Sequence, residues 1–153
     1  MKVEERIKEL GINLPHGAKP VAAYVPVVQT GNLLFVSGQD CRVDGKLIFE
    51  GKVGKDITLE QGKLCARQCI INALAALKDY LGDLDRIKRI VKILGFVNSA
   101  EGFVSQPYVI NGGSELLIEI FGENGNHARS AIACNELPFN TPVEIEMIVE
   151  IGE

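Results

Sequence analysis

The stretch VEIEMIVEI at residues 143–151 restricts the fold more than any other part of the sequence. Side chains of a strand alternate between its two faces, so this stretch divides into two sets. One face would carry Val143, Ile145, Met147, Val149 and Ile151, and the other Glu144, Glu146, Ile148 and Glu150. The first set is entirely apolar and has to be covered. We therefore expect a β-sheet packed against another layer.

Two segments have the periodicity of helices that could form this layer. Thr58 and Gln61 fit a capping box at the start of the first, and Gly82 ends it. Between them, apolar residues recur at helical spacing: Ala66, Cys69, Ile70, Ala73, Leu74, Leu77 and Leu81. The second helix is expected from about Pro107 to Phe121. The pair Gly112–Gly113 falls inside it, so either another backbone approaches closely there or the helix is interrupted.

The remaining segments predict further strands. Residues 22–39 indicate a β-hairpin, because two apolar runs flank the turn signal TGN. Pro26 lacks an amide hydrogen, which favours an edge position or a bulge for the first strand. Three more strands are expected at residues 45–51, 86–97 and 128–134. A short helix over 3–10 and a connector over 13–22 precede them, and the order becomes β-β-β-α-β-α-β-β.

A chain of 153 residues is expected to form one domain, residues 1–153, with a short N-terminal helical extension over about 1–20. Strands outnumber helices, and two helices cover one face of the sheet, which is an α+β layout. The other face carries apolar residues such as Ile148. These favour a partner, and hence an oligomer.

Composition and charge exclude several classes of protein. No apolar stretch approaches the ~20 residues that span a bilayer. The N-terminal MKVEERIKEL carries charges where a signal peptide needs an apolar core, so a cytoplasmic protein is expected. The net charge is −4, and lysine and arginine are scattered among acids, which disfavours nucleic-acid binding. The basic run RIKRIVK at 86–92 fits a strand with one solvated face better.

No metal or cofactor is predicted. The sequence has no CxxC pair, and neither His16 nor His127 lies near a cysteine pair. The four cysteines are therefore expected to be small buried hydrophobic residues: Cys41, Cys65, Cys69 and Cys134. The phosphate-binding, dinucleotide-binding, serine-hydrolase and zinc-protease motifs are also absent.

Polar residues on the last two strands are candidates for chemistry. Arg129 would share a strand face with Ala131 and Ala133, which leaves room for its guanidinium to bind a small carboxylate. A salt bridge at a sheet edge or interface is the alternative. Glu144 and Glu146 could orient or activate a water molecule, or could simply lie on a solvated face.

Spacing restricts how Arg129 and Glu144 could meet. If the last two strands form a hairpin, Glu144 pairs near Ala133, about four residues or roughly 13 Å from Arg129. Long side chains or a bulge could narrow this gap. Otherwise the two groups meet only across a cleft or a subunit boundary.

Further polar residues could contribute hydrogen bonds. Tyr24, Ser37, Gly38 and Asn111 lie at a predicted strand, a strand end and beside two glycines, although each alone is typical of a surface or a turn. His127 is expected in a loop or a cap.

Together, these segments resemble the YjgF/Rid family, the reactive intermediate deaminases, over most of residues 22–151. YVPVVQTGNLLFVSGQ (24–39) looks like the first hairpin of the family, and GDLDRIKRIVKILGFV (82–97) like its passage from helix to strand. Its C-terminal signature, the most specific part, is similar to ARS (128–130), Leu137–Pro138 and VEIEMI (143–148).

The resemblance implies a chorismate-mutase-like α+β fold, with one mixed β-sheet and two long helices on one face. It also implies a homotrimer with three clefts between subunits. The activity implied is hydrolysis of 2-imino acids or their enamine tautomers, such as 2-aminoacrylate, to 2-keto acids and ammonia without a cofactor. In the implied site, Arg129 binds the substrate carboxylate and Glu144 positions the attacking water, in a cleft lined by Tyr24, Ser37, Gly38 and Asn111.

Departures from the family pattern indicate a divergent subgroup. Ala131 stands where many members have a cysteine, and IACNE replaces a valine-rich continuation. Three alternatives therefore remain. The chain could be a trimeric protein that binds small carboxylates without turnover, or an endoribonuclease, against which the acidic balance counts. Chorismate mutase activity is suggested by fold analogy alone.

Overall fold

The structure is a computed structural model that describes residues 2–16 and 23–152. The predicted connector over 13–22 and the predicted N-terminal extension therefore lie partly outside the described residues. The elements, in chain order, are α1 (Val3–Glu9), β1 (Val27–Thr30), β2 (Leu33–Gln39), β3 (Arg42–Val43), β4 (Lys46–Leu47), α2 (Leu59–Leu81), η1 (Leu84–Arg86), β5 (Ile87–Asn98), α3 (Gln106–Phe121), η2 (Gly122–Gly125), β6 (Ala128–Cys134), η3 (Pro138–Asn140) and β7 (Val143–Ile151).

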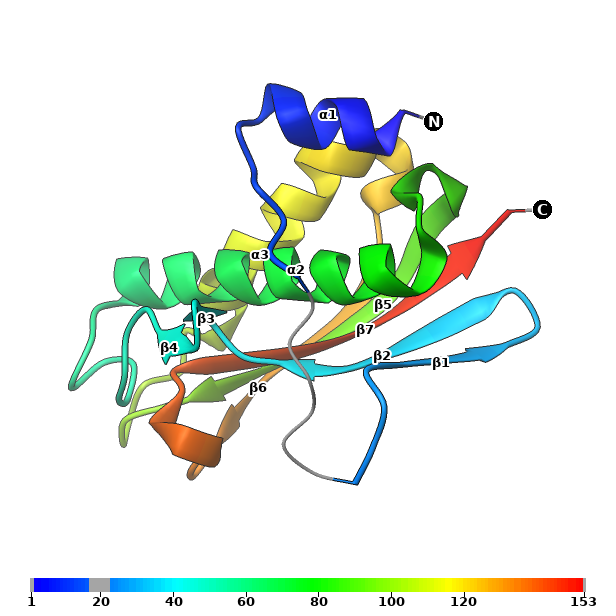
Figure 1. Cartoon of the computed structure of the whole chain (residues 1–153). Helices are drawn as coiled ribbons and strands as arrows, with labels where there is room; N and C mark the ends of the chain where they lie inside the picture. The colour runs from blue at the N-terminus through cyan, green and yellow to red at the C-terminus, as the bar shows by residue number, and fades with distance from the viewer. Residues whose placement is uncertain (1, 17–22, 153) are drawn as a thin grey trace.

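Five strands form one mixed sheet in the order β1-β2-β7-β5-β6. Strands β5 and β6 are parallel, and the other neighbours are antiparallel. Helix α3 connects the parallel pair, as a parallel connection requires. As a result β5 lies between β6 and β7, and the last two strands do not form a hairpin (Figure 1). The hairpin estimate of their separation therefore does not apply.

Helices α2 and α3 cover one face of the sheet, and α1 packs at the end of α3 (Figure 1). The apolar set of β7 is buried beneath them, as predicted. The capping box of α2 is formed: the Gln61 amide donates to Thr58 Oγ1 at 3.1 Å, and the Thr58 amide donates to Gln61 Oε1 at 2.9 Å. The predicted α+β fold with two long helices on one face is confirmed.

Helix α3 continues through its glycine pair because a second helix approaches it there. A Cβ atom on Gly112 would lie 2.1 Å from the backbone oxygen of Lys63 in α2. A Cβ on Gly113 would lie 2.8 Å from the Ile70 side chain. Close approach of α2, by its backbone at Gly112 and by the Ile70 side chain at Gly113, is therefore the reason for the two glycines, and the helix is not interrupted.

The strand predicted over residues 45–51 is too long, and it does not belong to the main sheet. Only Lys46–Leu47 is a strand, and it pairs with β3 in a separate two-stranded sheet. The turn between them uses Asp44 at φ 51° and Gly45 at φ 80°, which folds the segment back on itself. The main sheet therefore has β1 as an edge strand, and Pro26 lies immediately before it, as expected.

Candidate functional site

Arg129 is held by the helix that crosses over it. On β6 it pairs in register with Ile93 of β5, whose side chain is buried beneath the helices. Its Nη1 donates to Asn111 Oδ1 at 2.8 Å and to Ser114 Oγ at 3.1 Å, and its Nη2 donates to the Pro107 carbonyl at 3.2 Å. All three acceptors belong to α3. The resemblance implied one cleft for all six predicted site residues, and within one chain the structure brings Arg129 and Asn111 into contact.

The three hydrogen bonds occupy part of the guanidinium. They use both Nη1 protons and one Nη2 proton, out of five N–H donors. Within the described residues, the Nε–H and the second Nη2–H have no partner. A planar carboxylate can accept two such parallel bonds.

Ser114 and His127 extend this network. His127 lies in the loop between η2 and β6, as expected, whereas sequence analysis did not select Ser114. Ser114 Oγ lies 2.9 Å from His127 Nε2, and His127 Nδ1 lies 2.6 Å from the Gly125 carbonyl. Ser114 lies three residues after Asn111 on the same helix, and this spacing places both side chains on one helix face. That spacing is the signal that could have identified it.

Glu144 occupies the other face of the sheet. It pairs in register with Phe96 of β5, and its carboxylate packs against Gly38 of β2. A Cβ on Gly38 would lie 2.8 Å from Glu144 Oε2, so the glycine leaves the space that the carboxylate fills. Burial raises the pKa of Glu144, and the negative charges of Asp40 and Glu146 raise it further. Asp40 was not among the sequence candidates.

Ser37 and Tyr24 lie near this second group. The Ser37 hydroxyl donates to the Val25 carbonyl at 2.7 Å, and its amide donates to the Pro26 carbonyl at 2.8 Å. These bonds attach the segment that contains the exposed Tyr24 to β2. The six predicted site residues therefore form two groups in one chain: Arg129 with Asn111 on the helix side, and Tyr24, Ser37, Gly38 and Glu144 around β2 and β7.

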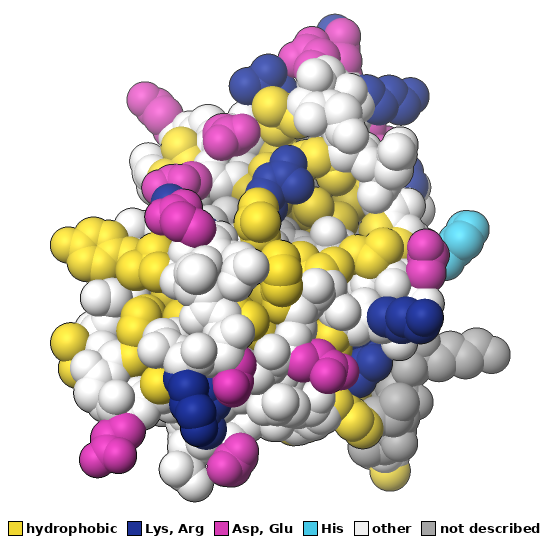
Figure 2. Space-filling view, turned by 90° about the vertical axis from the view of Figure 1, so that its left-hand side faces the viewer, with side chains coloured by type: hydrophobic (Ala, Val, Ile, Leu, Met, Phe, Trp, Pro, Cys, Tyr) yellow, Lys and Arg dark blue, Asp and Glu magenta, His cyan; other side chains and the backbone are white. Residues whose placement is uncertain are grey.

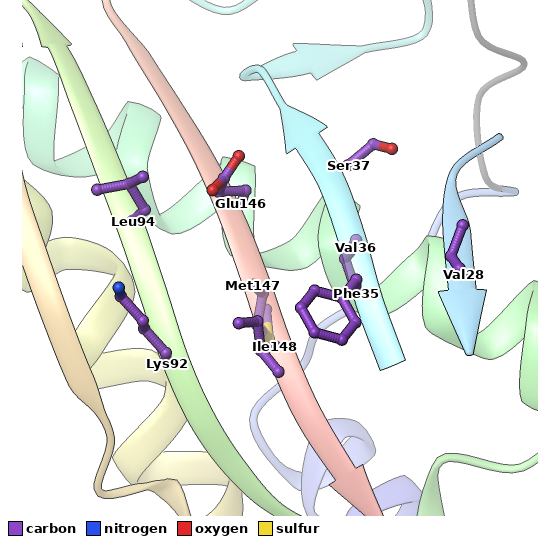
Figure 3. Close-up of a pocket in the computed structure, with 9 residues that line it drawn as sticks. All are labelled: Val28, Phe35, Val36, Ser37, Lys92, Leu94, Glu146, Met147 and Ile148. Carbon is purple, nitrogen blue, oxygen red and sulfur yellow. The ribbon is translucent and has the colours of Figure 1, made fainter. Parts of the chain in front are cut away.

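The uncovered sheet face has a shallow apolar pocket of about 330 Å³ close to the second group. Figure 3 shows Phe35 and Ser37 of β2, Glu146 and Ile148 of β7, and Lys92 and Leu94 of β5 around it, with Val28 of β1 at the side. Phe35 is 42% exposed and Val28 is 53% exposed. An apolar surface of this kind is typical of a face covered by a partner.

The face shown in Figure 2 has no single basic patch, because its lysine and arginine side chains are interspersed with acidic side chains. In the described ranges, no group of three or more histidine, cysteine or acidic residues could hold a metal ion. Cys41, Cys65 and Cys69 are buried as predicted, whereas Cys134 is half-buried. None of the helices in the described part of the chain is long and apolar enough to cross a membrane.

The family described as "YjgF/chorismate_mutase-like, putative endoribonuclease" matches residues 4–151. The chain belongs to the YjgF/Rid family. The match begins within α1, so that most of this helix lies inside the matched region. The resemblance proposed from the hairpin, the helix-to-strand passage and the C-terminal signature is confirmed.

Relatives of similar length place the chain in a divergent subgroup of the YjgF/Rid family. Protein TCP17 of Trypanosoma cruzi is 41% identical over 152 residues, which cover 99% of this chain and 95% of the relative. The structure of Atu1372 from Agrobacterium tumefaciens, a protein of unknown function, is 46% identical with a TM-score of 0.91, covering 98% and 92% of the two chains. A "putative endoribonuclease" from Shewanella oneidensis MR-1 is 34% identical with a TM-score of 0.95, covering 99% and 100%.

Proposed function

We propose that this chain hydrolyses small 2-imino acids, or their enamine tautomers, to 2-keto acids and ammonia. The observation that carries the proposal is the state of Arg129. Three hydrogen bonds to α3 fix its guanidinium, and two N–H groups remain for a ligand. A substrate carboxylate that accepts both would be held in one orientation, with its imine carbon at a defined place.

Glu144 would act on the attacking water. Its carboxylate takes one proton from the water as the water oxygen bonds to the imine carbon, and delivers it to the imine nitrogen to give a carbinolamine. The carboxylate then takes the hydroxyl proton and delivers it to the amine nitrogen, so that the C=O bond forms as the C–N bond breaks and ammonia leaves. A carboxyl group serves both steps best when its pKa is near the working pH. The raised pKa of Glu144, caused first by burial and then by Asp40 and Glu146, supports this role. No redox step or cofactor is needed for this chemistry.

The complete site would lie between two copies of the chain. Arg129 contacts the helix layer, whereas Glu144 lies on the uncovered face, so one small substrate would reach both only where subunits meet. Proteins of the YjgF/Rid family typically form trimers. We propose a homotrimer in which the uncovered sheet face, including Phe35 and Ile148, is buried and Tyr24, Ser37, Gly38 and Asn111 line the cleft.

The direct test is the decay of 2-aminoacrylate, generated by a serine or threonine dehydratase, with and without this protein. We expect acceleration by the wild type and a loss of about 100-fold in Arg129→Ala, because two charge-assisted hydrogen bonds disappear. Glu144→Gln should also lose turnover. Arg67→Ala, which removes an arginine from α2, is the matched control and should keep activity. Unchanged turnover in Arg129→Ala would contradict the assignment.

A protein that binds small carboxylates without turnover is the second candidate, and the same arginine supports it. Pyruvate binding, measured beside imine hydrolysis, distinguishes the hydrolase from the binding protein. A binding protein needs Arg129 but not Glu144, so a wild type that binds pyruvate and hydrolyses no imine would favour this candidate.

Endoribonuclease activity is suggested by the printed names of the family and of the Shewanella oneidensis relative. The mixed charges in Figure 2 and the net charge of −4 do not favour a phosphate backbone as ligand. A gel-shift titration with single-stranded RNA at two salt concentrations would detect such binding, which should weaken steeply with salt.

A further inference from the structure

Ser114 and His127 form the inner end of the network that holds Arg129, and neither would touch a substrate bound at the outer edge of the guanidinium. Ser114 is 8% exposed, on the buried side of α3. Its Oγ lies between Arg129 Nη1 at 3.1 Å and His127 Nε2 at 2.9 Å. The chain of contacts ends at the Gly125 carbonyl, 2.6 Å from His127 Nδ1.

The chemistry of these groups sets the direction of each bond. A carbonyl oxygen only accepts, so His127 Nδ1 must carry a proton. In a neutral ring Nε2 is then an acceptor, and the Ser114 hydroxyl donates to it. The oxygen of Ser114 is left to accept from Arg129. Each member donates to the next one inward, and such chains strengthen their own hydrogen bonds.

The backbone around Gly125 fixes the far end of this chain. A Cβ on Gly125 would lie 2.3 Å from the Leu117 carbonyl oxygen, so η2 packs directly on α3 only because this residue is glycine. The Gly125 carbonyl is therefore held at the base of the His127 ring. The ring, in turn, is held against Ser114.

We propose that Ser114 and His127 are positioning residues that hold the guanidinium of Arg129 ready for the substrate carboxylate, with His127 neutral and protonated on Nδ1. This inference rests on the proposed role of Arg129 in carboxylate binding. If the His127 ring were protonated, the imidazolium and the Arg129 guanidinium would both donate to Ser114 Oγ, and Ser114 could no longer donate to Nε2. The neutral ring leaves the serine oxygen free to accept from the arginine.

The first test needs no ligand and no activity. Long-range proton–nitrogen NMR of the two histidines should show His127 as the Nδ1–H tautomer, with His16→Gln assigning the signals. Arginine side-chain NMR should show separate Nη1 and Nη2 resonances for Arg129, assigned by their loss in Arg129→Lys. Ser114→Ala and His127→Leu should speed rotation of the guanidinium about tenfold, because one hydrogen bond that fixes it is lost or weakened.

His127→Gln is the conservative variant, since its side-chain oxygen can accept from Ser114, and it should keep slow rotation. His16→Gln changes an exposed histidine and should leave Arg129 unaffected. The proposal would be overturned if the spectra showed His127 as the Nε2–H tautomer or as a protonated ring. It would also be overturned if rotation of the Arg129 guanidinium stayed slow in Ser114→Ala and in a folded His127→Leu.

Pyruvate titration then distinguishes this proposal from the proposed function. Ser114→Ala should weaken pyruvate binding about tenfold and raise KM with little change in kcat, as expected for a contact made equally in ground and transition states. If the wild type neither binds pyruvate nor hydrolyses imines, the proposed function fails. The ligand-free spectra still decide whether Ser114 and His127 position Arg129.

Discussion

The side chains of Arg129 and Glu144 leave the same sheet on opposite faces. Arg129 pairs with Ile93, which is buried beneath the helices, and Glu144 pairs with Phe96, three positions further along β5. Side chains alternate between faces along a strand, so an odd offset separates the two groups by the thickness of the sheet. This relationship is the reason for expecting a site that two copies of the chain share.

A mixed oligomer tests the shared site. Subunits with Arg129→Ala or Glu144→Gln are each expected to be inactive alone. Co-expressed in equal amounts, they should recover about a quarter of wild-type activity. A site is complete only when one subunit supplies the intact arginine and its neighbour the intact glutamate, and each condition is met about half of the time. The measurement is imine hydrolysis by the purified mixture, with mass spectrometry to establish mixed assembly. Mixed oligomers without any recovery would contradict a site made from two chains.

The pH dependence of activity reports on Glu144. Its pKa is raised by burial, then by Asp40 and Glu146, so the acid limb of kcat/KM should lie above the ordinary range of a glutamate. Asp40→Asn removes one of the two negative charges and should move this limb to lower pH. A pH profile of kcat/KM for wild type and variant checks the shift, and an unmoved limb would count against Glu144 as the titrating base.

The same raised pKa predicts that Glu144 reduces stability at neutral pH. The folded state binds the proton more tightly than the unfolded state, so the contribution of Glu144 is complete below the ordinary glutamate pKa and is lost as pH rises through the raised value. In Glu144→Gln the side chain is an amide that does not titrate, so this variant lacks the pH-dependent loss of stability. Its Tm relative to wild type should therefore increase from acid to neutral pH, and a pH-independent difference would contradict the prediction.

Gly38 should be required for catalysis more than for folding. Its φ is not in the left-handed region, and the three atoms nearest to an added Cβ would all belong to the Glu144 side chain, with Oε2 at 2.8 Å. Gly38→Ala should displace the carboxylate and lower kcat about tenfold or more, while overpacking costs roughly 1 kcal/mol of stability. Gly152→Ala, where a Cβ meets nothing within 4 Å, is the control for both measurements. Full activity in Gly38→Ala would contradict the proposal that Glu144 activates the attacking water.

Gly112 should matter chiefly for stability. A Cβ there would lie 2.1 Å from the Lys63 backbone oxygen, and a backbone cannot move aside as a flexible side chain can. Gly112→Ala should force α2 and α3 apart and lower the unfolding free energy by about 2–3 kcal/mol, despite the better helix propensity of alanine. Urea denaturation checks this, again with Gly152→Ala beside it. A stabilised variant would show that the helices separate without cost.

Local patterns were sufficient to predict several elements. The alternation of β7 and the capping box and periodicity of α2 specify their structures because side-chain direction within one strand or helix depends only on its own repeat. The resemblance added the family and the pairing of Arg129 with Glu144. It also gave Asn111, which contacts Arg129, a place in the cleft. The short β4 was mispredicted because its turn at Asp44–Gly45 pairs it locally with β3, outside the main sheet.

By itself the sequence determined which residues face the same way along each element. Which elements become neighbours was decided only by the tertiary structure, because pairing and helix packing depend on contacts between segments far apart in the chain. The insertion of β5 between β6 and β7 is one example, and it places Arg129 and Glu144 in separate groups. The charge repulsion between Asp40 and Glu144 and the hydrogen bond from Arg129 to Ser114 are two further examples. None of these depends on a repeat within one segment, so no local pattern predicts them.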